Sequence, residues 1–176
     1  ELHRNAADWH EKHGLADDAV RHALAAGDAP RAACLVDYYV DGCIQGAREA
    51  TLSRWLAALP AELVASRPRL LLARSLVALL EGDLAVLEET LDAAERALAR
   101  DPGEPFESSV GTQASWMANV PAMIARGRGA LAECRGDADR ALAFSRRAVA
   151  LVAEGEHMLE ALSQAVYQET TLSFRE

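Results

Sequence analysis

One short phrase recurs along this chain: a run of helix-forming residues, the pair Gly-Asp, and then a second helix-forming run. It occurs at Gly27-Asp28, Gly82-Asp83 and Gly136-Asp137. Glycine is favoured just past the end of a helix, and an aspartate side chain can accept a hydrogen bond from a free N–H at the start of the next helix. Each pair therefore predicts a tight turn between two helices. Repeated helical hairpins form a stacked array, and such arrays usually bind other molecules rather than catalyse reactions.

The two later copies of the phrase can be aligned. Pro68 begins a run that reaches Gly82 after 14 residues, and Pro121 begins one that reaches Gly136 after 15 residues. Because proline is favoured in the first helical turn, each run is read as one complete helix. The sequence predicts two stacked antiparallel hairpins, formed by residues 68–82 with 84–100 and by residues 121–136 with 138–152.

The segment 101–120 interrupts this pattern with prolines, glycines and serines. From Pro68 to Pro121 the two hairpins begin 53 residues apart, compared with about 34 for a tetratricopeptide unit. The excess of about 20 residues is interpreted as an insertion between the hairpins. Before them, the periodicity predicts shorter helices, including one over 29–40, and Gly42 and Gly46 are expected to loosen the chain that follows it.

The composition agrees with an all-α fold. Apolar residues make up 51% of the chain, aromatic residues only 5%, and no stretch shows the alternation typical of a strand. The net charge of -9 and the pI of about 5.1 disfavour binding to nucleic acid or to an anionic membrane, because phosphate contacts need clustered basic residues. No apolar run reaches the length of about 20 residues that a membrane span requires.

The cysteines give a further indication. There are three of them, Cys34, Cys43 and Cys134, an odd number without a CxxC motif, so a disulfide framework is not expected and a cytoplasmic location is favoured. The chain starts with Glu1 and ends within a predicted helix, which suggests a fragment of a longer protein.

No sequence motif predicts catalysis, a cofactor or a metal site. The only lysine, Lys12, does not belong to a phosphate-binding loop. His10, His13 and His22 could in principle hold a metal, but surface or capping histidines are the favoured interpretation. The acidic run Glu88-Glu89, Asp92 and Glu95 is interpreted as a solvated helix face rather than a pair of catalytic carboxylates. The chain is therefore predicted not to be an enzyme.

The three tryptophans differ in their positions along the chain. Trp9 lies on one helical face with Leu2 and Ala6, and Trp55 lies on another apolar stripe, so both are expected in the core. Trp116 lies in the insertion, where contact with a ligand or a partner remains an alternative to packing.

Arg74 and Arg128 each stand eight residues before a Gly-Asp pair, so they occupy the same place in their repeats. Each could pair with an acidic residue on a neighbouring helix or extend its charged group into solvent. Alternatively, equivalent positions of stacked repeats line up along one face, so both could meet an anionic ligand, with Trp116 at the rim. Arg74, Arg128 and Trp116 are therefore the candidate ligand- or partner-binding residues.

Several phrases resemble a known protein family. They are LHRNAADW at 2–9, HGLADDAVRHALAAGD at 13–28, WLAALP at 55–60, SRPRL at 66–70 and RGD at 135–137. Together they are similar to the region that follows the nucleotide-binding module in MalT-like large LuxR-family transcriptional regulators.

The resemblance covers about residues 1–155 and implies a tetratricopeptide-like superhelical array. It further implies a connector at 1–46, after a nucleotide-binding module that is absent here, and sensor or interaction repeats at 47–176. In this family, such a region binds an inducer or a regulatory protein, and this binding alters the ATP-switch and DNA-binding modules elsewhere in the protein. A stand-alone tetratricopeptide scaffold for protein–protein interaction is the alternative.

Overall fold

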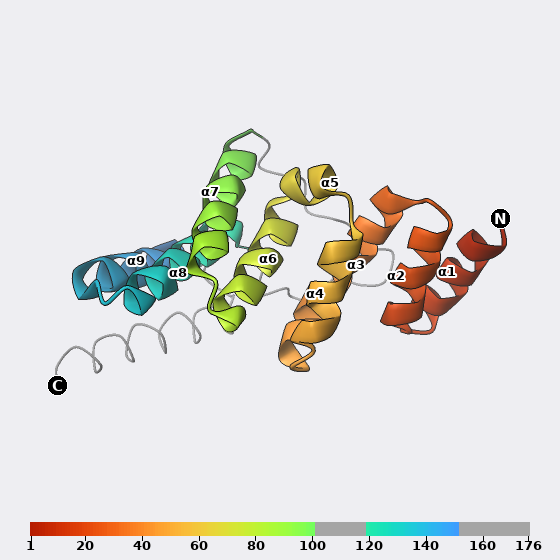
Figure 1. The fold of residues 1–176 in the computed structure, drawn as a ribbon, viewed down its shortest axis with the longest axis horizontal. Coiled ribbons are helices and arrows are strands. Elements are labelled where there is room, and N and C mark those ends of the chain that lie inside the picture. Colours follow the sequence, from red (N-terminus) through yellow and green to blue (C-terminus); the bar gives the residue numbers. More distant parts are fainter. Residues whose placement is uncertain (101–118, 152–176) are drawn as a thin grey trace.

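The computed structural model describes residues 1–100 and 119–151, and within these residues all regular structure is helical. Figure 1 shows the helices in chain order. They are α1 (Leu2–Lys12), α2 (Ala16–Ala25), α3 (Ala29–Gln45), α4 (Glu49–Ala58), α5 (Ala61–Ala65), α6 (Pro68–Glu81), α7 (Leu84–Arg100), α8 (Val120–Cys134) and α9 (Ala138–Leu151). The prediction of an all-α fold is confirmed.

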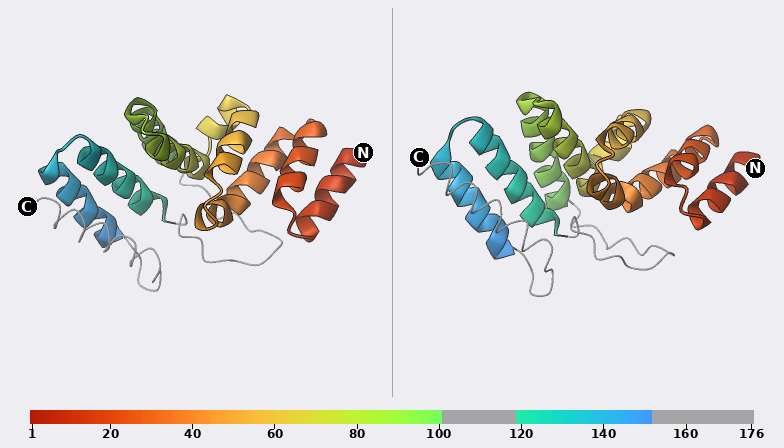
Figure 2. Two further views of the ribbon diagram at one scale, coloured as in Figure 1. Left: turned by 60° about the horizontal axis from the view of Figure 1, so that its bottom comes forward. Right: turned by 90° about the horizontal axis from the view of Figure 1, so that it is seen from below.

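The helices follow one another along a curved row, with α1 at one end and α8 and α9 at the other (Figures 1 and 2). Helices α6 and α7 form one hairpin and α8 and α9 another, and α8 packs against both helices of the preceding hairpin. Most of the buried apolar side chains form a single cluster that runs from Ala7 in α1 to Leu131 in α8. The predicted stack of two hairpins is thus confirmed.

The three Gly-Asp pairs form the turns that the sequence predicts. Gly27, Gly82 and Gly136 adopt φ angles of 71°, 75° and 73°, a left-handed conformation in which a residue without Cβ is not strained. The aspartate that follows each glycine accepts a hydrogen bond at its Oδ1 atom from a backbone N–H three residues later, at 3.0 to 3.2 Å. Each pair therefore ends one helix and caps the next.

Two further turns have the same geometry without the Gly-Asp phrase. The backbone N–H of Leu15 bonds to the carbonyl of His10 at 2.9 Å, and that of Arg48 bonds to the carbonyl of Cys43 at 2.8 Å. The aspartates of the Gly-Asp pairs make the same bond to the carbonyl five residues earlier, at 2.9 to 3.0 Å. The five turns therefore share one backbone design, in which Ala47 takes the glycine position with a φ of 49°.

We expect Ala47→Gly to stabilise the protein. A left-handed alanine costs roughly 1–2 kcal/mol, and glycine removes this strain while adding a smaller entropic cost in the unfolded chain. The net gain should be about 1 kcal/mol, or roughly 2–4 °C in melting temperature for a chain of this size. Thermal unfolding followed by circular dichroism measures it. Gly82→Ala is the matched reverse change and should lower the melting temperature. A lower melting temperature for Ala47→Gly would show that Ala47 is not strained by its left-handed conformation.

The third helix is longer than predicted. It continues through Gly42 to Gln45, where the sequence predicted an end at 40 and a loosened segment. The extra turns are stabilised by burial, because Cys43 is completely buried in the core. All three cysteines are free thiols, as expected. Within 1–100 and 119–151, no helix has the length and apolar character needed to cross a membrane.

Candidate interaction surfaces

The two candidate arginines have different surroundings. Arg74 lies on α6 with an exposed side chain, and within the described part of the chain it forms no hydrogen bond or ion pair. Arg128 lies on α8, and its side chain is only 15% exposed. Trp116 lies outside the described residues. The structure therefore presents Arg74 to solvent and holds Arg128 in a contact between helices.

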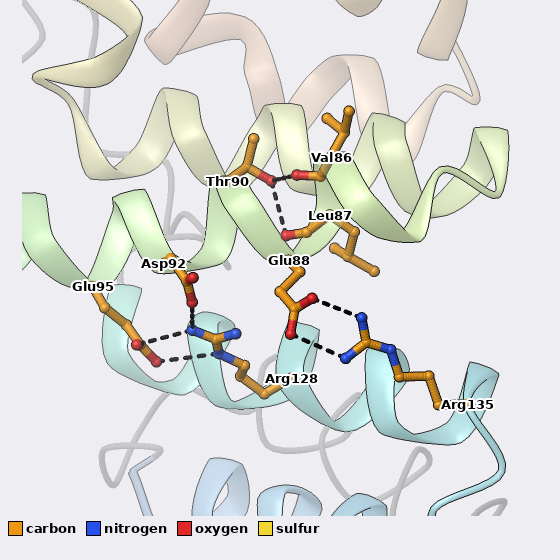
Figure 3. A network of polar contacts seen from close by, with 8 residues as sticks. All are labelled: Val86, Leu87, Glu88, Thr90, Asp92, Glu95, Arg128 and Arg135. Carbon is orange, nitrogen blue, oxygen red and sulfur yellow. Dashed lines mark hydrogen bonds and ion pairs between the residues drawn. The ribbon is translucent and has the colours of Figure 1, made fainter.

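Arg128 is held by two carboxylates of α7 (Figure 3). Its Nη2 atom lies 3.0 Å from Oε2 of Glu95 and also contacts Oδ1 of Asp92, while its Nε donates to Oε1 of Glu95 at 3.4 Å. Burial alone would lower the pKa of Arg128, but the hydrogen bonds to Glu95 and Asp92 outweigh it and the pKa is raised. This arrangement matches the first of the two alternatives for Arg128, an ion pair with a neighbouring helix.

The acidic row of α7 contacts the next hairpin as a unit. Glu88 receives two parallel hydrogen bonds from Arg135, at the end of α8, with lengths of 3.0 and 2.7 Å. These bonds lower the pKa of Glu88. Asp92 and Glu95 follow at spacings of four and three residues, so all three carboxylates share the helix face that meets α8. This face is therefore not only solvated, as the acidic run predicted, but also contacts the next hairpin; the spacing of the acids along one stripe was the signal for this role.

Similar ion pairs join the other helices. Their partners are Arg31 with Asp8 and Glu11, Arg54 with Asp17, and Arg69 with Asp37 and Asp41. In each case, as at Arg128 and Arg135, the arginine belongs to the later helix and the carboxylate to the earlier one. Exposed pairs contribute little individually, about 0–1 kcal/mol, but all of these pairs run in the same direction along the row.

The two tryptophans predicted to be in the core differ. Trp55 is only 3% exposed, and its indole N–H donates to Oδ1 of Asp17 at 2.7 Å. Trp9 is 53% exposed, so the prediction of a core position was wrong for this residue. The reason is its place in the array: α1 is the first described helix of the row (Figure 2), and the stripe of Leu2 and Trp9 lies on the side of α1 opposite the buried Ala7.

This stripe belongs to a surface that we call the α1 outer surface. It consists of Leu2, Trp9, Lys12, His13 and Leu15. All five residues are exposed, and Leu2, Trp9 and Leu15 are three of the four large apolar residues classed as exposed in the described chain. The Trp9 ring stacks on His13 with their centroids 3.9 Å apart, and the Nδ1 atom of His13 lies 2.6 Å from the Trp9 carbonyl. His13 therefore caps the C-terminus of α1, as predicted.

The remaining N-terminal histidines gather between α1 and α2. The Nδ1 atoms of His3 and His22 lie 2.9 Å apart, and the rings of His10 and His22 stack with centroids 5.2 Å apart. Within the described ranges, no three or more His, Cys, Asp or Glu side chains come together in a way that could hold a metal ion. Removal from water lowers the pKa of His22, and nearby positive charge on Arg21, His10 and His3 lowers it further, while Asp18 opposes this.

The lowered pKa of His22 predicts a loss of stability on mild acidification. The folded state binds a proton on His22 less readily than the unfolded state, in which the pKa of this histidine has its ordinary value of 6.5. The folded protein is therefore at its full stability above pH 6.5 and loses stability as the pH falls below this value. Melting temperatures between pH 7.5 and 5.5 should fall more steeply for the wild type than for His22→Gln. If the melting temperatures of the two proteins changed with pH in parallel, protonation of His22 would not be the cause of the loss of stability.

Comparisons with known proteins found similarity for only part of the chain. No family model and no solved structure matches it. The matching curated proteins include the serine/threonine-protein kinase PknK of Mycobacterium tuberculosis and that of Mycobacterium bovis. Each is 38% identical over 100 residues, which is 57% of this chain. The chain spans only 9% of the length of these relatives, so it is similar to a small section of much larger proteins.

Proposed function

We propose that this chain is a regulatory sensor and interaction region of a MalT-like transcriptional activator. In this role it binds an inducer or a partner protein in the cytoplasm and relays binding to an ATP switch and a DNA-binding module elsewhere in the polypeptide. Catalysis and DNA recognition are assigned to those other modules, and this region needs no cofactor.

The observation that carries the proposal is the array itself. Stacked hairpins with a continuous apolar core create an extended surface on which side chains of successive repeats are displayed side by side. The similarity to a short section of a much longer protein kinase is consistent with a module that forms part of a larger polypeptide. The opening phrase LHRNAADW favours the transcriptional regulators over an unrelated repeat protein.

The alternative is a stand-alone tetratricopeptide scaffold that binds another protein. The architecture fits both proposals, because each requires only stacked helical hairpins. The complete gene separates them: a phosphate-binding loop upstream and a helix-turn-helix downstream support the regulator, and their absence supports the scaffold.

Arg74 and Arg128 provide the test at the level of residues. Arg128→Gln should lower the melting temperature, because it leaves Asp92 and Glu95 facing each other without a cation, whereas Arg74→Gln should leave it unchanged. If α6 contacts the inducer, Arg74→Gln should weaken binding by roughly ten- to a hundredfold, the equivalent of about 1.5–3 kcal/mol for a charge-assisted hydrogen bond.

The measurement is a thermal-shift screen of small dicarboxylates, sugar phosphates and acidic peptides, followed by calorimetric titration of each compound that binds. Arg96→Gln, which changes another exposed arginine on the neighbouring helix α7, is the matched control. An anion that binds wild type and Arg74→Gln equally well would exclude Arg74 from the site. Equal melting temperatures for wild type and Arg128→Gln would show that Arg128 is not a structural contact.

A further inference from the structure

The histidines of this chain are concentrated at the contact between α1 and α2. Four of the five lie within the first 22 residues, and three of these contact one another. The ring of His22, on α2, meets the rings of His3 and His10, on α1, with centroid distances of 5.1 and 5.2 Å. We call these three residues the histidine stack. Both helices of the contact are described, so its geometry does not depend on what covers the α1 outer surface.

The histidine stack is one of two contacts that hold α1 in place. Ala7 is the only residue of α1 that the described part of the chain buries completely. The two histidines of α1 lie two helical turns apart on one side of Ala7, and the carboxylates that bind Arg31 of α3 lie on its other side. Loss of the histidine contact alone would therefore loosen one side of α1 and leave the other side attached.

The hydrogen bond within the histidine stack limits the number of protons that the stack can bind. The Nδ1 atoms of His3 and His22 lie 2.9 Å apart, so one nitrogen must donate and the other must accept. A first proton preserves this bond, because a charged ring can donate to a neutral one. When both rings are charged, both nitrogens carry hydrogens, and the two N–H groups would point at each other. A second proton on this pair is therefore incompatible with the contact.

The third ring resists protonation for a different reason. The Nδ1 atom of His10 is buried and has no hydrogen-bond partner among the described residues, so a proton on this atom would have no acceptor. The rings of His10 and His22 are nearly parallel, with an angle of 10° between their planes. Two charged rings in this arrangement would repel each other. Further charging of the stack thus favours separation of α1 from α2 along this side.

The groups around His22 give the same direction. Removal from water is the largest cause of its lowered pKa, and the charges of Arg21, His10 and His3 add to it. Asp18 on α2 favours protonation, but its carboxylate is bound to Arg21 at 2.5 Å. The arginine that α3 contributes to this region binds on the other side of α1. The closed contact therefore holds an additional proton less readily than the separated helices do.

We propose that the histidine stack is a pH-sensitive latch, which holds α1 against α2 near neutral pH and releases this side of α1 when the stack takes up a second proton. Because opening takes up a proton, the latch is closed above the ordinary histidine pKa of 6.5 and opens as the pH falls below it. The carboxylates that bind Arg31 stay charged over this range, so α1 pivots on that contact rather than detaching. The latch is independent of the sensor function proposed for Arg74, and failure of one leaves the other in place.

The experiment is hydrogen exchange of the full chain, followed by NMR at pH 7.5 and 5.5 and corrected for the intrinsic exchange rate at each pH. Opening of the α1 amides should increase at least about threefold at pH 5.5, relative to the hairpin of α6 and α7, because each proton taken up can multiply the opening constant up to about tenfold per pH unit. His22→Gln removes the central ring and should abolish this pH dependence. His13→Gln, which changes a histidine outside the stack, is the matched control and should respond as the wild type does.

Arg31→Gln separates the latch from a general weakening of α1. It removes the contact on the other side of Ala7, so it should increase opening of α1 at both pH values and keep the response to acid. The latch is excluded if acid weakens α1 and the hairpin of α6 and α7 equally, or if His22→Gln keeps the wild-type response. NMR titration of the histidine Cε1 protons in which all three rings titrate at the ordinary value would also overturn the proposal.

Discussion

Replacing Leu91 by alanine is expected to lower the free energy of unfolding by about 2–5 kcal/mol. Leu91 is completely buried on α7, and it lies directly against Gly127 of α8: a Cβ atom built at Gly127 would lie only 2.7 Å from Cδ2 of Leu91. Truncation removes a fully packed side chain and leaves a cavity between the two hairpins. Urea denaturation followed by far-ultraviolet circular dichroism measures the change.

Leu80→Ala on α6 is the matched control, because Leu80 is 58% exposed and its truncation should cost much less. Gly127→Ala tests the contact directly. In the wild type the added methyl group would press on Leu91. In Leu91→Ala the same methyl group enters the cavity, so the double variant Leu91→Ala/Gly127→Ala should be more stable than Leu91→Ala alone. A loss below about 1 kcal/mol for Leu91→Ala would show that the two hairpins do not pack through this residue.

Asp37→Ala is expected to cost about 3 kcal/mol, the second large effect. Asp37 is a buried residue of α3, and its Oδ1 atom accepts a hydrogen bond of 2.6 Å from Nε of Arg69 on α6. Arg69 also donates to the Asp37 carbonyl at 3.3 Å. Removing the carboxylate leaves a half-buried guanidinium without its main partner, and this desolvated charge, rather than the lost attraction alone, makes the change expensive.

Arg54→Gln provides the comparison for Asp37→Ala. It breaks the pair between Arg54 and Asp17, in which both side chains are mostly exposed, and it should cost less than about 1 kcal/mol. Chemical denaturation of both variants gives the two free energies. Asp37→Asn keeps an oxygen acceptor for Arg69 and should fall between them. If Asp37→Ala lowered the free energy of unfolding no more than Arg54→Gln does, the contact between Asp37 and Arg69 would owe no extra stabilisation to its burial.

The sequence predicted the hairpins because their turns depend on local chemistry. A left-handed glycine followed by a capping aspartate is recognisable without knowledge of tertiary contacts. The same turn at Ala47-Arg48 carries neither residue and could not be found in this way, since the packing of α3 and α4 imposes the strained conformation on Ala47. For the same reason, burial of Cys43 extends α3 beyond the predicted end.

The candidate surfaces were less predictable, because exposure depends on what covers a residue. Trp9 and Trp55 both lie on apolar helical stripes, yet only the Trp55 stripe meets neighbouring helices. Likewise Arg74 and Arg128 share a repeat position, and only Arg128 faces an acidic row, which lies 33 and 36 residues earlier in the chain. Periodicity identifies the face of a helix but not its neighbour.

The neighbour-by-neighbour packing of the row has a kinetic consequence. The closest helix contacts join segments that are adjacent in sequence, such as α1 with α2 and α8 with α9. Loops between such contacts are short, so little chain entropy is lost before a contact forms, and folding of this topology proceeds quickly from any hairpin outward. The reverse process begins at the ends: α1 can open without disturbing α6 and α7, so its amide protons should exchange with solvent well before those of the hairpin that α6 and α7 form.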